Sequence, residues 1–477
     1  MFRKTVYLYL IIALPVFAED NTAQRIWQNT RQAVQHQDNK ALEESESFQT
    51  DETYSKTENE QQDVGQALFS AVNHQDWDTV RTLLAQYERQ PGYDQDIALF
   101  ARASLARSEG EVQQSRQSYE TLLQRQPDFT RGRLDLARLL FEDQLNRESA
   151  AEFDKVPRET LPEPVQNNIR LFQDALSQRQ KWQGSFSLGA VRNSNVNEGS
   201  GGTQPAIIDC PPELQDECYI FQGQAPNPRP SAGIAYEAAA ARRWQLSGHH
   251  GLHTRVLAYG RFYRDSEYNE HTLNISPGYQ FADAKRTVTA APLWEWNSIG
   301  KHAQYRAYGM RTEWNENRSR WSWNTETEWK KMVYFDEEVK HNNSRLMSVF
   351  NTLSFSLRDD LILFGGLDFQ RRIAKDETES YRQPSLRLGI FKQFGTGFDA
   401  SLNTLFRHRS YDAENATLGQ RRRDNEQIYT LSLGAERWKF AGLKPTLTLK
   451  HRRVNSNIRW LYRYQQNEIG LSLVKYF

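Results

Sequence analysis

The feature that most constrains the fold of this chain is a period-two alternation running through residues 183–477. Between residues 321 and 330 the odd positions carry Trp or Thr, and the even positions carry Ser, Asn, Glu or Lys. The same alternation recurs in four later segments, at residues 385–390, 398–407, 429–436 and 446–450. Successive side chains of a strand point to opposite faces, so the pattern predicts β-strands with one apolar and one polar face.

The polarity and length of these segments favour a transmembrane barrel, in which the apolar face meets lipid and the polar face lines a wet lumen. The segments run for about 10–15 residues, longer than the ~5–6 usual in soluble sheets. Mean hydropathy is −0.79, and no stretch after residue 20 is apolar for the ~18 residues that a membrane helix needs. Aromatic pairs at strand ends resemble interfacial girdles: Trp294/Trp296, Trp438/Phe440 and Tyr462/Tyr464.

Short and long connections alternate along this region. Short joins are expected near residues 247–251, 282–285, 315–318, 358–360, 394–397 and 440–442. Longer joins are expected near residues 195–231, 265–269, 297–301, 334–343, 375–382, 412–424 and 455–464. We therefore predict an antiparallel barrel of about fourteen strands over residues 181–477, with twelve or sixteen left open. In such barrels short turns face the periplasm and long loops face outside.

The preceding region, residues 63–180, carries a helical repeat of 34 residues. Two windows align, with matched positions at Ala103/Ala137, Ser115/Ser149, Tyr119/Phe153 and Leu122/Val156, and with Pro127 and Pro162 one step out of register. Small residues let two helices approach, an aromatic ring fills the gap to the next pair, and proline ends the second helix. This is typical of tetratricopeptide repeats, so we expect packing roles for Ala103, Tyr119, Pro127, Ala137 and Phe153. A less regular copy spans residues 66–91, and residues 165–176 are expected to form a closing helix.

The N-terminus has the pattern of a signal peptide. Arg3 and Lys4 precede a short apolar stretch, and small residues before position 19 favour cleavage after Ala18. The alternative, a short membrane anchor, requires a longer apolar stretch. We exclude residues 1–18 from the fold, and expect residues 19–62, which are rich in polar residues, to form a flexible segment.

Charge and cysteine usage add two expectations. Residues 19–182 hold 19 Lys and Arg against 29 Asp and Glu, whereas residues 183–477 hold 39 against 31. The acidic excess of the first part is either a solvated helical surface or a face for a partner. Cys210 and Cys218 are the two cysteines of the chain. Because an exported chain meets an oxidising compartment, we predict a local disulfide between them.

The last strand resembles the signal read by the machinery that inserts barrels into the outer membrane. Ile469, Leu471 and Leu473 alternate toward Tyr476 and the terminal Phe477, although Lys475 departs from the usual apolar residue. The full arrangement resembles the surface lipoprotein assembly modulators, or Slam proteins. The resemblance covers nearly the whole mature chain, and its motifs are the 34-residue repeat, the junction at residues 181–186, residues 191–197 and the terminal residues 475–477.

The resemblance implies an outer-membrane translocon with a periplasmic repeat domain. Its clients would be surface lipoproteins or secreted haem- or iron-binding proteins, and further partners would be outer-membrane lipid, the barrel insertion machinery and periplasmic chaperones. The inward positions Arg387, Arg407, Glu436 and Lys450 would line the lumen. There the arginines would either hold acidic client segments weakly or form ion pairs that stiffen the barrel.

Other readings are less well supported by the residues. The chain contains no hydrolase, zinc-protease or phosphate-loop motif, so we expect no catalytic, cofactor or metal site. His249, His250 and His253 are expected in or near a short turn, and the run 421–423 of three arginines in an outside loop. That run would bind anionic lipopolysaccharide or be solvated, and nucleic acid is not expected there. A polysaccharide exporter would need sugar-binding aromatic and acidic tracks, and a porin would need no repeat arm.

Overall fold

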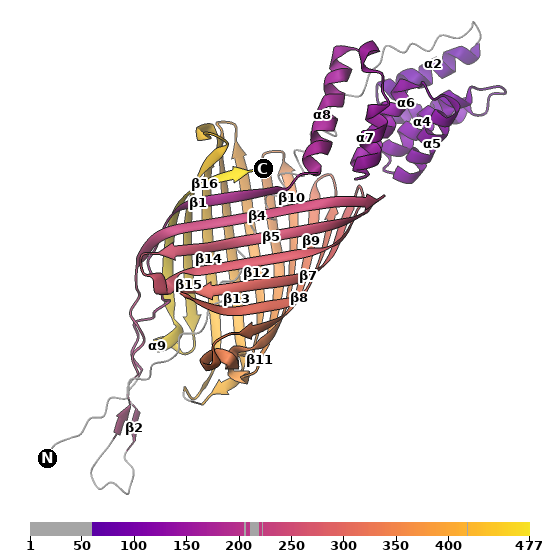
Figure 1. Ribbon diagram of the computed structural model, residues 1–477. Helices are drawn as coiled ribbons and strands as arrows, with labels where there is room; N and C mark the ends of the chain where they lie inside the picture. Colours follow the sequence, from indigo (N-terminus) through magenta and orange to yellow (C-terminus); the bar gives the residue numbers. More distant parts are fainter. Residues whose placement is uncertain (1–59, 205–206, 210–218, 222, 417) are drawn as a thin grey trace, which may run out of the picture.

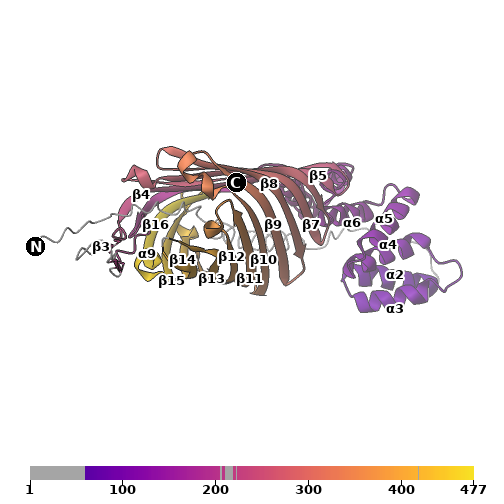
Figure 2. The same cartoon turned by 90° about the horizontal axis from the view of Figure 1, so that it is seen from below.

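The computed structural model describes residues 60–204, 207–209, 219–221, 223–416 and 418–477, which form a helical arm and a β-barrel (Figure 1). The predicted signal peptide, almost all of the polar segment after it, and both Cys210 and Cys218 lie outside the described residues. In both views the arm lies at the end of the barrel opposite to a small hairpin made of β2 (Ile207–Asp209) and β3 (Tyr219–Phe221) (Figures 1 and 2).

The arm is a stack of antiparallel helix pairs. Its α-helices are α2 (Glu60–Asn73), α3 (Trp77–Tyr87), α4 (Gln95–Ser108), α5 (Val112–Arg125), α6 (Thr130–Glu142), α7 (Asn146–Asp154) and α8 (Glu163–Arg179), with a 3-10 turn η1 (Arg158–Thr160) before α8. Aspartates begin two of them: the carboxylates of Asp76 and Asp94 accept hydrogen bonds from backbone N–H groups at the start of α3 and α4. No described helix has both the length and the hydropathy needed to cross a membrane.

The predicted 34-residue repeat reappears as a repeated contact. The Oγ of Ser115 donates to the carbonyl of Ala103 over 2.7 Å, and the Oγ of Ser149 donates to the carbonyl of Ala137 over 2.8 Å. Ala103, Ala137 and Phe153 are fully buried, and Tyr119 is 1% exposed. Small residues therefore bring paired helices together, as the sequence predicts, and a buried serine bonds across each pair.

The two prolines of the repeat have different roles, and only Pro127 ends the second helix of its repeat as predicted. Pro127 is exposed in the turn after α5, so it limits the helix and does not pack in the core. Pro162 does not end α7, which stops at Asp154. It is instead the N-cap of α8, after the intervening turn η1. The second repeat is thus shorter at its end than the first, and its proline belongs to the next helix.

The barrel closes with fourteen antiparallel strands, as predicted. They are β1 (Gln183–Asn193), β4 (Ser231–Ser247), β5 (His250–Tyr263), β6 (Glu270–Ala282), β7 (Arg286–Ile299), β8 (His302–Asn317), β9 (Trp321–Tyr334), β10 (Ser344–Arg358), β11 (Leu361–Ala374), β12 (Tyr381–Phe394), β13 (Phe398–Asn415), β14 (Gln420–Ala435), β15 (Leu443–Ser456) and β16 (Tyr464–Tyr476). Each strand pairs with the next in the chain, and β1 pairs with both β4 and β16 to close the sheet.

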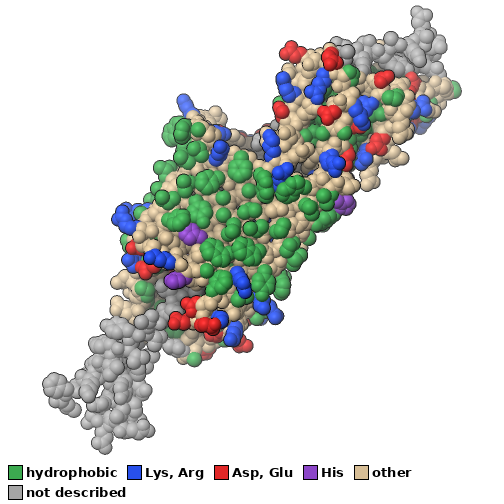
Figure 3. All heavy atoms as spheres, viewed as in Figure 1, with side chains coloured by type: hydrophobic (Ala, Val, Ile, Leu, Met, Phe, Trp, Pro, Cys, Tyr) green, Lys and Arg blue, Asp and Glu red, His purple; other side chains and the backbone are tan. Residues whose placement is uncertain are grey.

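The barrel inverts the usual distribution of side chains. Leu367 and Leu471 on the outer face are 67% and 61% exposed, whereas Glu295 and Arg311 inside are each 1% exposed. Figure 3 shows the outer apolar side chains as a band across the barrel wall. Because a lipid-facing wall and a polar lumen require this inversion, the molecule is an outer-membrane β-barrel.

The connections follow the predicted alternation with two differences. The β7–β8 join contains only Gly300 and Lys301, and the β13–β14 join is confined between Asn415 and Gln420. The strands extend farther than expected at this end of the barrel. As a result, the three arginines at 421–423 lie at the start of β14, and the prediction of a loop there is wrong. At the end that carries the arm, the β4–β5, β6–β7, β8–β9, β10–β11 and β12–β13 joins contain two or three residues each.

Candidate functional site

The loop between α6 and α7 docks on two short turns of the barrel. Asp143, which follows α6, is 7% exposed. Its Oδ2 lies 2.9 Å from Nε2 of His249 in the β4–β5 turn, and its Oδ1 accepts a 3.2 Å hydrogen bond from the backbone N–H of Ala284 in the β6–β7 turn. Burial raises the pKa of Asp143, and the nearby His249 and the Ala284 N–H partly offset that rise.

Local backbone geometry presents these groups to one another. Gln144 has a φ of 60°, a left-handed conformation that ends α6 and turns the chain toward α7. Gly248 has a φ of 54° in the tight β4–β5 turn, where a glycine meets no steric cost. The left-handed residue on each side therefore leaves Asp143 and His249 adjacent, although they are 106 positions apart in the chain.

A second set of hydrogen bonds joins the start of α7 to the end of β4. The side chain of Gln245 donates to Oε2 of Glu148 over 2.7 Å and accepts from the backbone N–H of Arg147 over 3.0 Å. The guanidinium of Arg147 also donates to the carbonyl of Leu246 over 3.0 Å. The arm is thus held on the barrel through side chains as well as through the chain itself.

Helix α8 is tied to the same loop just before the chain enters β1. The Nη1 of Arg179 donates to the carbonyl of Phe141 over 2.8 Å and to Oδ1 of Asn146 over 3.1 Å. Its guanidinium lies 3.6 Å from the centre of the Phe141 ring. These contacts fix the last helix of the arm relative to the docking loop, and so fix the direction in which the chain enters the barrel.

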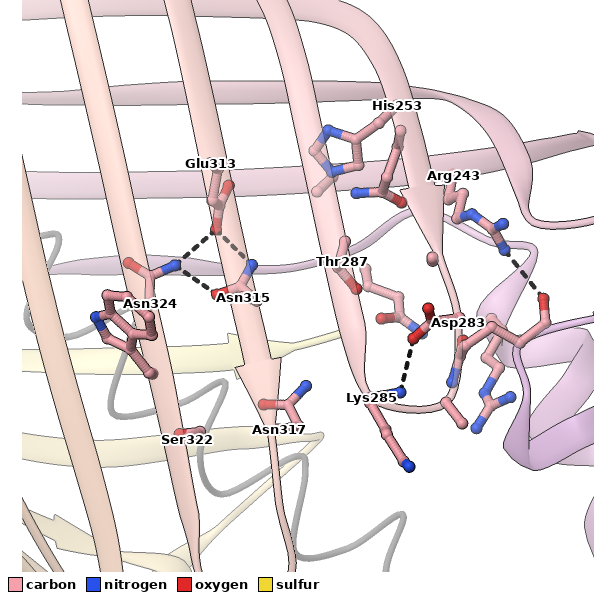
Figure 4. A pocket seen from close by; sticks show the side chains of 18 of the residues that line it. Arg243, His253, Asp283, Lys285, Thr287, Glu313, Asn315, Asn317, Ser322 and Asn324 are labelled. Atoms are coloured by element: carbon pink, nitrogen blue, oxygen red, sulfur yellow. Dashed lines mark hydrogen bonds between the residues drawn. The ribbon is translucent and has the colours of Figure 1, made fainter. Parts of the chain in front are cut away.

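A cavity of about 870 Å³ lies between the arm and this end of the barrel, and we call it the mouth cavity (Figure 4). The arm lines it with Arg107, Glu142, Arg179 and Lys181, and the barrel lines it with residues that include Arg243, His253, Arg255, Lys285, Arg311, Glu313, Asn317, Ser322 and Glu326. Nine Arg and Lys residues and four carboxylates line it in total. The mouth cavity is therefore basic, and its field favours anionic groups.

Ion pairs form the inner wall of the mouth cavity. Arg311 contacts Glu313 and places its Nε 3.1 Å from Oε1 of Glu326. Arg255 binds the same carboxylate with two nitrogens, each at 3.1 Å. Deeper in the lumen, Nζ of Lys330 lies 2.7 Å from Oε1 of Glu295. Charges buried in this way are stable only when paired, so the wall is polar and also fixed in shape.

The two arginines predicted for the lumen lie in similar networks. Arg387 is 3% exposed and binds both oxygens of Asp368, at 2.6 and 2.7 Å. Arg407 places Nη1 2.8 Å from Glu426, whose other oxygen accepts from Arg452 at 2.5 Å. The geometry matches the ion-pair alternative stated above, because each guanidinium already has a carboxylate partner within the wall.

The other two lumen predictions have separate outcomes. Lys450 pairs across the sheet with Thr430 and follows Leu449, which is exposed on the lipid side, so Lys450 lies on the inner face. The prediction that Glu436 lines the lumen is wrong. Strand β14 ends at Ala435, and Glu436 begins the 3-10 turn η5 (Glu436–Trp438), where it pairs with Lys439 at 2.7 Å. The period-two pattern of the sequence continues to Glu436, one residue beyond the end of the strand.

The C-terminal residues complete the sheet. Tyr476 pairs with Ser185 of β1, and Phe477 exchanges backbone hydrogen bonds of 2.8 and 3.1 Å with Gly184. The terminal strand therefore meets the strand that directly follows the arm. The role of Tyr476 and Phe477 as an insertion signal stays a prediction.

Sequence reasoning missed the mouth cavity and the Asp143–His249 contact. The sequence predicts that His249 lies in or near a short turn, and the structure places it in that turn in contact with Asp143 of the arm. The short join at residues 247–251 predicts that His249 lies at the periplasmic end of the barrel, but a single sequence does not show which distant residue it meets. Among the residues that the structure describes, no cluster of three or more His, Cys, Asp or Glu could hold a metal ion.

Comparison with known proteins agrees with this division of the chain. A family described as surface lipoprotein assembly modifier matches residues 182–477, and its N-terminal TPR repeats match residues 51–153. A hemophilin secretion modulator of Acinetobacter baumannii is 32% identical over 86% of this chain and 85% of its own length. Surface lipoprotein assembly modifier 1 of Neisseria meningitidis is 28% identical, over 83% and 79%. Among solved structures, a Pseudomonas aeruginosa FadL homologue covers 62% of this chain and 90% of its own, with 7% identity and a TM-score of 0.37.

Proposed function

Because this chain belongs to the surface lipoprotein assembly modifier family, we propose that it is a translocon that delivers client proteins from the periplasm to the cell surface. The barrel supplies the passage through the outer membrane, and the arm stands in the periplasm beside its entrance. The observation that carries the proposal is the mouth cavity, since its wall is shared by the arm and the barrel. A passive pore has no need for an arm fixed at its entrance.

The names of the relatives support a proposal for the client class. One relative is named for hemophilin secretion and others for surface lipoprotein assembly. We propose that the client here is a surface lipoprotein or a secreted haem- or iron-binding protein. The family is one of assembly and secretion factors, so the role of the chain is to bind and guide rather than to catalyse.

The route of the client follows from the arrangement of charges. The arm captures the client, or a periplasmic chaperone that carries it, and the basic mouth cavity receives an acidic or extended segment. Beyond the mouth, paired charges such as Arg387–Asp368 offer polar walls without unpaired charge. The apolar side chains that face the lumen form small, separate clusters, such as Ile362 with Phe364, so a chain in transit meets no large apolar patch. The barrel insertion machinery acts earlier, when it places the barrel in outer-membrane lipid.

Protease shaving of intact cells tests the proposal. Cells with and without the gene are treated with protease, and the released peptides are identified by mass spectrometry. We expect one or two exported proteins to disappear from the surface of the deletion strain while they remain in the periplasm. Unchanged surface proteins together with altered polysaccharide export or solute uptake would overturn the proposal in favour of a sugar exporter or a porin.

Charge reversal at the mouth gives a sharper version of this test. Lys181 and Lys285 both line the mouth cavity, so Lys181→Glu with Lys285→Glu should lower surface delivery without removing the barrel from the membrane. A matched control is Arg89→Glu with Lys155→Glu, because both residues are exposed on the arm outside the mouth cavity. Equal delivery by the two variants would show that the mouth charge does not act on the client.

A further inference from the structure

The outer face of the barrel carries a row of five basic residues on five neighbouring strands, which we call the outer-rim row. The row comprises Arg306 on β8, Lys331 on β9, Arg345 on β10, Arg371 on β11 and Arg382 on β12. Lys331 is directly opposite Arg345, and Arg371 is directly opposite Arg382. Arg371 lies directly opposite Met347 on β10, and Arg345 lies two residues before Met347 on the same face of that strand. Arg345 and Arg371 are therefore diagonal neighbours on the outer face. The register therefore makes the row continuous.

The row borders the lipid-facing band at the end of the barrel away from the arm. Lys331 has the same strand parity as Trp329, and Arg345 has the same parity as Met347; Trp329 and Met347 are 50% and 44% exposed on the lipid side. The strands end soon after the row, since β9 stops at Tyr334 and β10 begins at Ser344. In Figure 3, basic side chains lie at the margin of the green band on the side away from the arm. This is the level of the outer-leaflet headgroups.

Most cations of the row have no carboxylate partner among the described residues. Like charges directly opposite each other destabilise a sheet, yet two such pairs occur here side by side. Within the described part of the chain, Arg371 pairs with Asp412 at 2.6 Å, while the other four row residues form no ion pair. The arm-side rim differs, because several of its cations have a carboxylate partner, as in Arg358–Asp360 at 3.2 Å.

We propose that the outer-rim row is a binding site for the phosphate groups of a phosphorylated glycolipid of the outer leaflet. Arg and Lys are the side chains that bind phosphate oxygens most strongly, and closely spaced cations suit a doubly charged anion. The apolar band next to the row receives the acyl chains of the same molecule. The site anchors the barrel at a fixed height and rotation in the membrane, and it is independent of the proposed client transport.

Binding to purified full-length protein in neutral detergent tests the proposal. Native mass spectrometry would follow a titration with bisphosphorylated lipid A, with dephosphorylated lipid A and with inorganic phosphate. The test variant is Lys331→Gln with Arg345→Gln, and the matched control is Arg358→Gln with Lys392→Gln on the arm-side rim. We expect bisphosphorylated lipid A to bind, and the test variant to weaken binding by about tenfold, whereas the control binds like the unmodified chain.

Four outcomes separate the alternatives. Loss of binding on dephosphorylation supports recognition of phosphate, and weak or absent binding of inorganic phosphate supports a lipid source for it. Equal binding of both forms of lipid A, or unchanged binding by the test variant, overturns the proposal. If the double variant fails to show the heat-dependent gel shift of a folded barrel, Arg382→Gln gives the same comparison with a single charge, because Arg382 is exposed and forms no ion pair with any residue that the structure describes.

Discussion

The arm and the barrel of this protein bury opposite kinds of side chain. In the arm, Tyr119 and Phe153 are at most 1% exposed, and polar residues cover the surface. In the barrel, Arg311 and Glu295 are each 1% exposed inside the wall, while Leu471 is 61% exposed outside. The two regions obey one rule in two solvents: apolar side chains leave water, into a core in the arm and into lipid in the barrel.

The difference also decides what holds each region together. Packed apolar volume stabilises the arm, so its sensitive positions are the large buried rings. In the described residues, the polar lumen of the barrel holds only small apolar clusters, so the strands are joined mainly by the backbone ladder and by buried ion pairs such as Arg387–Asp368. Mutations should therefore separate the two regions by mechanism.

The largest expected effect comes from breaking one buried ion pair in the barrel. Arg387→Met leaves the carboxylate of Asp368 buried without its cation, which should cost about 3–5 kcal/mol. The midpoint of heat-dependent gel mobility in detergent measures this loss. The double variant with Asp368→Leu should recover most of the stability. If the single and double variants melt alike, paired charge does not stabilise the wall.

An effect of similar size is expected in the arm for a purely apolar reason. Phe153→Ala removes a fully buried ring, which should cost about 3–5 kcal/mol through lost burial and the remaining cavity. Circular dichroism at the helix band would follow thermal unfolding of the full chain. Leu171→Ala is the control because Leu171 is 50% exposed. A shift in the barrel transition instead of the helical one would contradict the separation of the two regions.

A smaller effect tests the contact that repeats every 34 residues. Ser149→Ala removes the hydrogen bond to the carbonyl of Ala137 and leaves that buried acceptor without its side-chain donor. The helical transition should lose about 1 kcal/mol. Ser115→Ala should give a matching loss, since its bond to Ala103 is equivalent. Unequal losses would show that the two serine hydrogen bonds contribute differently to stability, although their geometry is equivalent.

The smallest effect is expected at an exposed ion pair. Lys439 and Glu436 lie in a turn with side chains 41% and 47% exposed. Lys439→Gln should change stability by less than about 0.5 kcal/mol, since solvent screens the pair. The same gel-shift midpoint checks this. A loss comparable to that of Arg387→Met would mean that burial does not control the strength of ion pairs in this barrel.

The fold could be predicted because its signals are local and repeated. Alternation along each strand, turn residues between strands and the 34-residue spacing each depend on nearby positions, and fourteen strands and the paired helices followed from them. Errors arose at the ends of elements. Glu436 continued the alternation past the strand, and the arginines at 421–423 were assigned to a loop because polarity alone does not mark the end of a strand.

The site could not be predicted in the same way because its contacts are long-range. Asp143 and His249 are 106 positions apart, and neither residue carries a local motif. The buried partners of Arg387 and Arg407 depend on sheet register, which one sequence sets only through its turns. The mouth cavity exists only once the arm is docked, so no segment of sequence encodes it alone.

Site-specific photocrosslinking during export tests whether the client passes through the mouth cavity. A photoreactive residue at Ser322 would sit in the mouth cavity, and one at Leu471 would face lipid. A client fused to a tightly folded domain would stall in transit. We expect a covalent adduct with the client at position 322 and none at position 471. Export of the unstalled client without an adduct at the mouth would contradict a route between the arm and the barrel.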